Sequence, residues 1–143
     1  SDNFPTKFLC SDAAVVTRRP LVHAGVLRFG GQMLVVVPGE GPCLRCLIPE
    51  IPPRKDSPTC SESGVVGAAA GVLGAWQAME AIKLLAGIAP PSAGRLLTVD
   101  TLTNDVTCVA VRRDPACPAC GDRPRISEPL SAAEYRYEGR CPA

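Results

Sequence analysis

The residues best suited to chemistry are two pairs of cysteines with the same spacing. Two residues separate Cys43 from Cys46 in Gly-Pro-Cys-Leu-Arg-Cys, and two separate Cys117 from Cys120 in Cys-Pro-Ala-Cys-Gly. Two thiolates with this spacing can reach one tetrahedral Zn²⁺ ion from a single turn, and two such turns complete a four-cysteine site. Because protein sulfurs then fill every coordination position, such an ion would hold the fold and perform no chemistry.

The two pairs are far apart in the chain. About 70 residues separate them, whereas self-contained zinc ribbons use roughly 15 to 20. A shared zinc ion would therefore be a clip between distant segments. Two alternatives stay open. A thioredoxin-like redox pair would begin a helix, and neither pair is followed by a helical pattern. Unrelated buried thiols are the other alternative.

A further cysteine is better placed for a reaction. Cys60 lies near the end of a proline-rich stretch, residues 43–63, that we expect to be irregular, and it comes just before a long helical pattern over residues 64–87. The N-terminus of a helix carries partial positive charge, which stabilises a thiolate. The alternative interpretation is a small buried thiol, so position alone does not assign Cys60 a role.

The elements that must position these cysteines are both helices and strands. We expect a helix over 6–15, a short buried strand over 21–24, two β runs over 26–30 and 32–37 that meet at Gly30-Gly31, and two strands over 95–101 and 106–112. Small residues in the first half of the 64–87 helix favour close packing against a sheet. Residues 122–143 have no clear period and are predicted to be a tail or linker.

Composition limits the partners and the compartment. The 143 residues, 46% of them hydrophobic, suffice for one domain with a core, and a formal net charge of +1 gives no electrostatic reason to expect nucleic acid or an anionic membrane. No signal peptide opens the sequence, and its longest apolar run is too short to span a bilayer. A reducing, cytoplasmic location is favoured. His23, the only histidine, lies in an apolar run and is expected to be structural.

Several stretches together resemble the ThiF/MoeB/HesA family of E1-like activating enzymes, bacterial relatives of ubiquitin-activating enzymes. The matching stretches are Asp-Asn-Phe-Pro-Thr-Lys-Phe-Leu at 2–9, Leu-Val-His-Ala-Gly-Val-Leu-Arg-Phe-Gly-Gly-Gln at 21–32, Pro-Gly-Glu-Gly-Pro-Cys-Leu-Arg-Cys at 38–46, Pro-Thr-Cys-Ser-Glu-Ser-Gly-Val-Val-Gly at 58–67, Gln-Ala-Met-Glu-Ala-Ile-Lys at 77–83 and Arg-Asp-Pro at 113–115. They follow one another without interruption as far as residue 121.

The resemblance implies an α/β fold. Residues 1–121 would be the C-terminal part of a Rossmann-like E1 adenylation domain, with a mixed, mainly parallel sheet that has antiparallel additions and a four-cysteine zinc clip. Residues 122–143 would be the tail or linker. A homodimer is implied by the resemblance as well.

The resemblance also implies an activity. Enzymes of this family use ATP and Mg²⁺ to adenylate the C-terminal Gly-Gly carboxylate of a ubiquitin-like sulfur carrier. Sulfur then comes from a sulfur donor or sulfurtransferase, for molybdopterin or thiamine type biosynthesis. The implied partners are the carrier and that sulfur source, with no nucleic acid and no membrane.

The resemblance assigns roles to single residues. Asp2 matches the second aspartate of the family's Asp-x-x-Asp-Asn motif, expected near Mg²⁺ and the phosphates, and Asn3 follows it. Lys7 occupies a usually basic position and is expected to face the phosphates. Cys60 matches the cysteine with which some members form a thioester or acyl-disulfide, or relay sulfur. The four paired cysteines match the structural zinc ligands.

The nucleotide-binding half of such an enzyme is not represented. The sequence starts inside the Asp-x-x-Asp-Asn motif and contains no GxGxxG fingerprint. We therefore expect the C-terminal part of a longer enzyme, and predict that these residues alone do not catalyse carrier-dependent pyrophosphate exchange. The alternative from another class is a non-catalytic, zinc-stabilised module that binds a ubiquitin-like protein. A nucleic-acid zinc module is disfavoured, because basic and aromatic residues do not alternate in the knuckles.

Overall fold

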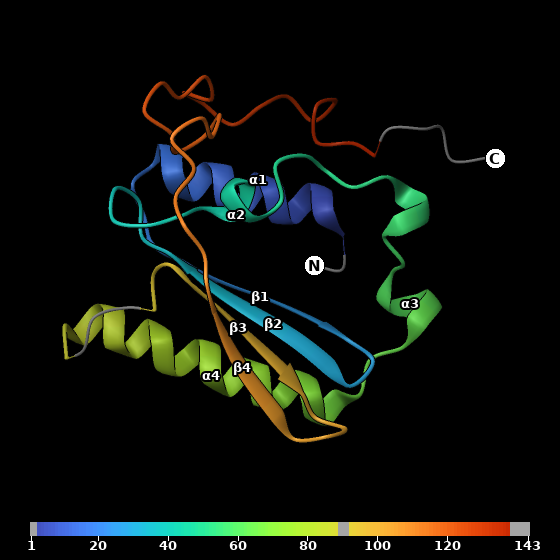
Figure 1. Ribbon diagram of the computed structural model, residues 1–143. Helices are drawn as coiled ribbons and strands as arrows, with labels where there is room; N and C mark the ends of the chain where they lie inside the picture. The colour runs from blue at the N-terminus through green and yellow to red at the C-terminus, as the bar shows by residue number, and fades with distance from the viewer. Residues whose placement is uncertain (1–2, 89–91, 138–143) are drawn as a thin grey trace.

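One four-stranded sheet and two long helices make up the fold in the computed structural model, which describes residues 3–88 and 92–137. The elements in chain order are α1 (Phe4–Val16), β1 (Leu21–Leu27), β2 (Gly30–Val36), α2 (Leu44–Leu47), the 3₁₀ helix η1 (Arg54–Asp56), α3 (Cys60–Ser63), α4 (Gly67–Ala86), β3 (Arg95–Asp100) and β4 (Asp105–Ala110) (Figure 1). The sheet has the order β1-β2-β3-β4. No helix among the described residues is both long and apolar enough to cross a membrane.

The two long helices confirm the predicted ones, and local sequence explains their ends. The side chain of Asn3 caps α1 by accepting a hydrogen bond from the Thr6 backbone N–H at 2.8 Å, and Pro5 lies in the first turn. α4 ends at Gly87, whose φ of 59° lies in the left-handed region that glycine adopts readily. α4 begins at Gly67, a little later than the sequence predicted.

The strands form two hairpins, with some differences from the prediction. The separate runs expected over 21–24 and 26–30 are one strand, β1, which pairs antiparallel with β2. The chain reverses at Arg28 and Phe29 rather than at Gly30-Gly31. β3 and β4 pair antiparallel as the second hairpin, and β4 ends at Ala110, before the predicted end.

The sheet is antiparallel, which corrects the expectation of a mixed, mainly parallel sheet. All three strand ladders are antiparallel. Parallel pairing in the described part of the chain is limited to two isolated bridges, Arg28 with Val65 and Val35 with Ala93. A hairpin can join only antiparallel neighbours, because a parallel pair needs a crossover of a dozen or more residues. The α/β class stands, with an antiparallel sheet.

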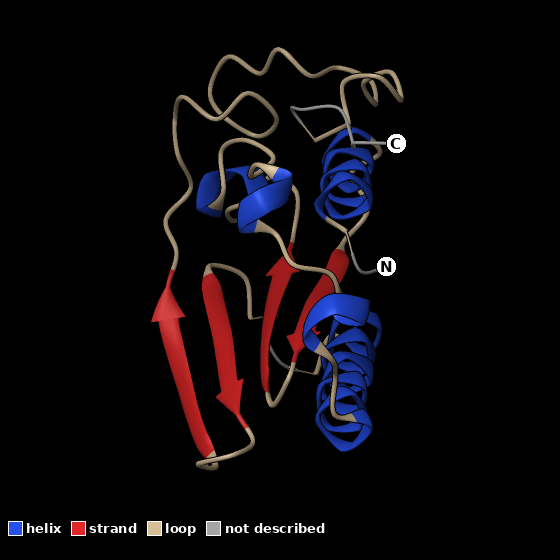
Figure 2. Ribbon diagram, turned by 90° about the vertical axis from the view of Figure 1, so that its right-hand side faces the viewer, coloured by secondary structure: helices blue, strands red, loops and turns tan. Residues whose placement is uncertain are grey.

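The two faces of the sheet are covered differently. α4 packs along one face, where its Leu73 is buried with Met33 and Val99 (Figure 2). On the opposite face, Leu34 and Val36 pack against the region of the paired cysteines at one end of the strands. Among the described residues, no helix packs directly on the rest of that second face. It is therefore the part of the sheet left available for a site.

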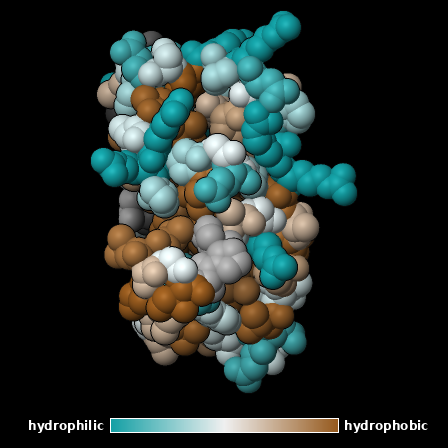
Figure 3. Space-filling model, turned by 90° about the vertical axis from the view of Figure 1, so that its left-hand side faces the viewer, coloured by the Kyte–Doolittle hydropathy of each residue, from teal (hydrophilic) through white to brown (hydrophobic). Residues whose placement is uncertain are grey.

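The outer side of α4 keeps apolar side chains exposed. Among them are Met79, Ile82 and Leu85, of which Leu85 is 90% exposed. Figure 3 shows apolar surface gathered on the half of the molecule that holds α4 and the sheet, whereas the other half is mostly hydrophilic. Packing on the sheet therefore uses only one side of α4.

The segment after residue 121 packs on the domain, although residues 122–137 contain no helix or strand. Tyr135 is buried against Phe8 of α1 and Leu44 of α2. Its hydroxyl donates a hydrogen bond to Asp12 Oδ2 at 2.8 Å. Figure 1 shows this segment running over α1. A linker free of the domain is therefore not what these residues form, and the domain boundary at residue 121 stays a prediction.

Gly31 sets the approach of α4 to β2. A Cβ at Gly31 would lie 2.9 Å from Leu73 Cγ. We expect Gly31→Ala to lower the free energy of unfolding by about 1 to 3 kcal/mol, because Leu73 or α4 must shift. Gly71→Ala is the control. A Cβ at Gly71 meets nothing within 4 Å, so this change should raise stability by about 0.5 to 1 kcal/mol. Urea unfolding measures both, and equal losses would contradict the prediction.

Candidate functional site

Four cysteine sulfurs meet at one end of the sheet. The Sγ atoms of Cys43, Cys46, Cys117 and Cys120 all lie within 4.8 Å of one another. Cys43 Sγ is 3.6 Å from Cys117 Sγ, and Cys46 Sγ is 3.3 Å from Cys120 Sγ. Zn–S bonds of about 2.3 Å in a tetrahedral site put the sulfurs about 3.8 Å apart. The four cysteines form no disulfide. The cluster therefore has the ligand type, number and spacing to hold one metal ion.

The backbone around the sulfurs forms two tight turns. Cys46 lies inside the four-residue helix α2, a short helix that the sequence did not predict, and its N–H donates to Cys43 O at 3.1 Å. In the second turn the Gly121 N–H donates to Cys117 O at 2.9 Å, and a Cβ at Gly121 would lie 2.5 Å from that oxygen. The Asp114 N–H points at Cys46 Sγ, at 3.4 Å. Amides directed at a sulfur favour the thiolate that binds metal.

Charge also favours a cation in the cluster. Hydrogen bonding to Cys120 and burial raise the pKa of the Cys43 thiol, and burial raises the pKa of Cys46 to about 11. Hydrogen bonds from Cys43 and its neighbours lower the pKa of Cys120 to about 5. Sulfurs this close repel one another when several ionise, and a divalent cation offsets that repulsion.

Arg45, between the first two cysteines, connects the cluster to α1. Its Nε and Nη2 each donate to one carboxylate oxygen of Asp12, at 2.8 Å, and Asp12 is fully buried. The guanidinium also lies 4.9 Å from the centroid of the Phe8 ring. Tyr135 donates to the same carboxylate. A bidentate pair of this kind is charge-assisted and geometrically specific. The sequence did not predict this network. The one local feature that could have indicated it is an aspartate within an apolar helix pattern.

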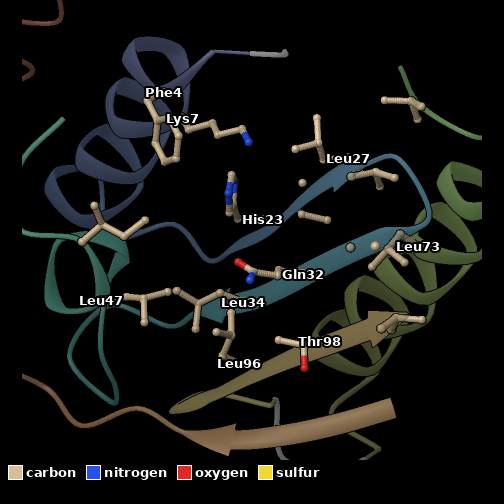
Figure 4. Close-up of a pocket in the computed structure, with 18 of the residues that line it drawn as sticks. Phe4, Lys7, His23, Leu27, Gln32, Leu34, Leu47, Leu73, Leu96 and Thr98 are labelled. Atoms are coloured by element: carbon tan, nitrogen blue, oxygen red, sulfur yellow. The ribbon is translucent and has the colours of Figure 1, made fainter. Parts of the chain in front are cut away.

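A pocket of about 970 Å³ lies on the open face of the sheet. Its floor carries His23, Gln32 and Thr98 from three neighbouring strands (Figure 4). Lys7 enters it from α1, and Cys60 lines it from the segment that precedes α4. The volume is within the range of small-molecule sites, about 300 to 1,000 Å³. The pocket therefore brings together two residues that the sequence singled out.

Lys7 reaches from α1 across to β1. A Cβ at Gly25 would lie 2.8 Å from Lys7 Nζ, and Nζ is 5.3 Å from the centroid of the Phe4 ring. Burial, and after it the charge of Lys7, lowers the pKa of His23 to about 4. His23 is therefore neutral at neutral pH, which agrees with the structural role expected for it.

Asn3 and Asp2 are the other two residues predicted near the nucleotide. Asn3 uses its side chain to cap α1 and is not among the residues that line the pocket. Asp2 lies outside the described residues. Of the two described positions, Lys7 lines the pocket and Asn3 does not, and the contact of Asp2, Asn3 and Lys7 with a nucleotide stays a prediction.

Cys60 is placed differently from the expectation. It begins the four-residue helix α3, whereas the long helix α4 starts at Gly67. The expected position of Cys60 at the start of the long helix is therefore wrong, and its role in the reaction stays a prediction. Cys60 is half-buried, and its Sγ lies 3.8 Å from Val26 O. The structure therefore assigns Cys60 to the pocket wall and not to the N-terminus of a long helix.

Comparison with known proteins identifies the family. The ThiF family model matches residues 1–119. The chain belongs to the ThiF family. The curated relative "Adenylyltransferase and sulfurtransferase MOCS3" of Bos taurus is 49% identical over 129 residues, which cover 90% of this chain and 28% of the relative. The "Sulfur carrier protein adenylyltransferase" of Thermus thermophilus is 47% identical over 146 residues, which cover 99% of this chain and 52% of the relative. This ThiF-family chain thus spans between a quarter and about half of these relatives.

Solved structures support the fold of this ThiF-family chain. Crystal structures of E. coli MccB, one with succinimide and one with ATP, match with TM-scores of 0.70 and 0.66. They cover 85% and 82% of this chain and 37% of the matched chain in both cases, at 18% and 19% identity. At such low identity the likeness shows the fold alone. It confirms the E1-like α/β fold that the sequence resemblance implied.

Removal of Arg45 tests how strongly the cluster and α1 are joined. We expect Arg45→Met to lower the free energy of unfolding by about 3 to 5 kcal/mol, because Asp12 is left as a buried, uncompensated charge. Adding Asp12→Asn should recover part of the loss, since the neutral amide still accepts the hydrogen bond from Tyr135. Urea unfolding measures both variants. A double variant less stable than Arg45→Met alone would refute this account of the pair.

Proposed function

We propose that the chain is part of an adenylyltransferase that activates the C-terminal Gly-Gly of a ubiquitin-like sulfur carrier. The observation that carries this proposal is the pocket on the open sheet face, in a chain whose relatives at 47% and 49% identity are named adenylyltransferases. The strands and the segment before α4 would support the body of the carrier, and its extended tail would enter the pocket. A Gly-Gly tail has no side chains, so it fits a narrow passage.

One cationic side chain of the pocket supports this proposal. Lys7 lines the pocket from α1, whereas its acidic lining residues are Asp56, Asp100 and Asp105, the last two from the β3–β4 hairpin. His23 is neutral and adds no charge. Bound ATP with Mg²⁺ would supply the adenylyl group that converts the unreactive carboxylate into an acyl-adenylate. Lys7 would attract the carboxylate and the phosphates, because an ammonium at a partly buried site acts over a low dielectric.

Asp2 and Asn3 belong to the same proposal. Both precede α1, and Asn3 fixes the first turn of the helix that carries Lys7. Their proposed place is near Mg²⁺ and the phosphates. In the isolated structure Asn3 acts as the helix cap, so its proposed contact to the nucleotide would add to that role.

Cys60 is the proposed nucleophile. Its thiolate would attack the carbonyl carbon of the acyl-adenylate, the bond from that carbon to the phosphate oxygen would break, and AMP would leave. The product is a thioester between Cys60 and the carrier. Cys60 lines the pocket that Lys7 also lines, which supports the view that a carboxyl group held there can reach it.

Zn²⁺ is the proposed ion of the four-cysteine cluster. A sulfur-only, four-ligand site suits Zn²⁺, and a closed site leaves no position for a substrate. Cys43, Cys46, Cys117 and Cys120 would hold the ion. Its role would be to join two distant segments of the domain, and the reaction would take place in the pocket.

Sulfur transfer and assembly complete the proposal. The Bos taurus relative is named for a sulfurtransferase as well, which supports a sulfur donor or sulfurtransferase as the next partner. A homodimer, a cytoplasmic location and a molybdopterin or thiamine type pathway are proposed from the family resemblance. The second candidate is a non-catalytic, zinc-stabilised module that binds a ubiquitin-like protein. The four-cysteine cluster and the open sheet face would serve such a module as well.

Metal content tests the role of the cluster. We expect one Zn²⁺ per chain by elemental analysis, and loss of that metal in Cys43→Ser and in Cys117→Ser. Loss of the metal should lower the free energy of unfolding by several kcal/mol, because metal affinity contributes to folding. Cys108→Ser, at an exposed cysteine, is the control and should retain the metal. Full metal content in both cluster variants would exclude the site.

Binding of a sulfur carrier separates the two candidate functions. We expect a carrier that ends in Gly-Gly to bind this chain, and its truncation by two glycines to weaken binding about tenfold or more, because the tail would occupy the pocket. Lys7→Ala should weaken binding of the intact carrier to a similar extent. Lys55 is an exposed lysine outside the pocket, so Lys55→Ala should leave this binding unchanged. Calorimetry measures each affinity.

Two results, one from calorimetry and one from an activity assay, would contradict these expectations. Equal affinity for intact and truncated carriers would favour the non-catalytic module. Carrier-dependent pyrophosphate exchange by these residues alone, at the rate of an enzyme, would contradict the expectation that a further nucleotide-binding half is needed.

A further inference from the structure

Arg54 joins the residues on either side of Cys60. Its Nη1 donates to Ser57 O at 2.8 Å, and its Nη2 pairs with Glu62 Oε1 at 2.9 Å. Ser57 precedes Cys60 and is buried, and Glu62 follows it in α3. One guanidinium thus spans the segment that presents the thiol.

Glu62 in turn holds the start of α3. Its Oε2 accepts a hydrogen bond from the Thr59 N–H at 2.7 Å. Hydrogen bonds from Thr59, and then from Arg54, lower the pKa of Glu62 to about 2. Glu62 therefore stays ionised at neutral pH, and its pairing with Arg54 persists there. Arg54, Glu62 and Thr59 fix the turn in which Cys60 is the first helical residue.

Tyr137 connects this segment to α1. The Arg54 guanidinium lies 5.8 Å from the centroid of the Tyr137 ring, and the Tyr137 hydroxyl accepts a hydrogen bond from the Phe4 N–H at 3.2 Å. Phe4 and Tyr137 both line the pocket. Two residues earlier, Tyr135 is buried and bonded to Asp12, so Tyr137 extends from an anchored point.

We propose that Arg54 and Tyr137 form a clamp that positions the Cys60 segment at the wall of the pocket. Both are positioning residues, since neither is assigned a contact with reacting atoms. The clamp rests on the proposed function only in its purpose, which is to keep Cys60 where the activated carboxyl group would be held. Its contacts themselves are part of the fold.

The clamp can open without unfolding of the domain. The Arg54–Glu62 pair is partly exposed, with side chains 35% and 53% accessible. Exposed ion pairs and cation–π contacts are individually weak, and such regions open locally more often than the core. The anchor at Tyr135 is buried and stays in place. Release of Tyr137 and Arg54 would therefore free the Cys60 segment alone.

Alkylation of Cys60 measures the clamp directly and needs neither carrier nor nucleotide. The metal-loaded chain is treated with iodoacetamide at fixed pH, and peptide mass spectrometry gives the rate for each cysteine. We expect Arg54→Gln and Tyr137→Leu each to raise the rate at Cys60 about fivefold, because weak contacts of this size hold the segment. The rate at exposed Cys108 in the same sample should not change.

Two further variants separate geometry from charge. Arg54→Lys keeps the charge and loses the fork that spans Ser57 and Glu62, so it should raise the rate at Cys60 nearly as much as Arg54→Gln. Lys55→Gln removes the neighbouring positive charge and should leave the rate unchanged. The urea midpoint of every variant should stay close to that of the wild type.

The outcomes are distinct. An unchanged rate at Cys60 in both Arg54→Gln and Tyr137→Leu would overturn the clamp, and so would a parallel rise at Cys108, which would indicate general loosening. A carrier that fails to bind while the alkylation results are as expected would contradict the proposed function and leave the clamp intact.

Discussion

The buried carboxylate of Asp12 is the point on which the rest of the structure depends. Arg45 pairs with it from between two cysteines of the cluster, and Tyr135 reaches it from the C-terminal segment. Three segments that are remote in the sequence, namely α1, the residues around Arg45 and the residues around Tyr135, therefore meet at this one carboxylate. An ionised group without partners is very costly in a protein interior, so these contacts must form together. Through them the cysteine cluster, α1 and the C-terminal segment behave as one unit, and α1 carries Lys7 into the pocket.

The second constraint is the unequal covering of the sheet. α4 lies close against one face because Gly31 has no side chain to hold it away from Leu73. In the described part of the chain, the opposite face is covered at one end, by the cysteine region and the end of α1. Its uncovered part carries His23, Gln32 and Thr98, side chains that tolerate partial solvation better than those of the core. The pocket thus lies where the packing of α4 on one face and of the cysteine region on the other leaves part of the sheet uncovered.

Cys60 begins the short helix α3 and not the long helix α4. The family resemblance singled out this thiol, and its position at the start of a long helix, which the sequence predicted, is wrong. Its surroundings are set by α3, by Arg54 and by the end of the described C-terminal segment. The four clustered cysteines and Cys60 also lie in different places, the first in the cluster and the second in the pocket. The cluster can hold a metal ion, and among the described cysteines only Cys60 lines the cavity.

The sequence by itself determined the two long helices, the β runs, the joining of Cys43 and Cys46 with Cys117 and Cys120, and the ThiF-family resemblance. These depend on periodicity, caps and spacing, which are local or repeated along the chain. Only the tertiary structure decided that the sheet is antiparallel, that Tyr135 closes on Asp12, and that Tyr137 reaches Arg54 at the pocket. Tyr135 and Asp12 are 123 positions apart. No local pattern encodes such a contact, because it exists only once the segments between them have folded.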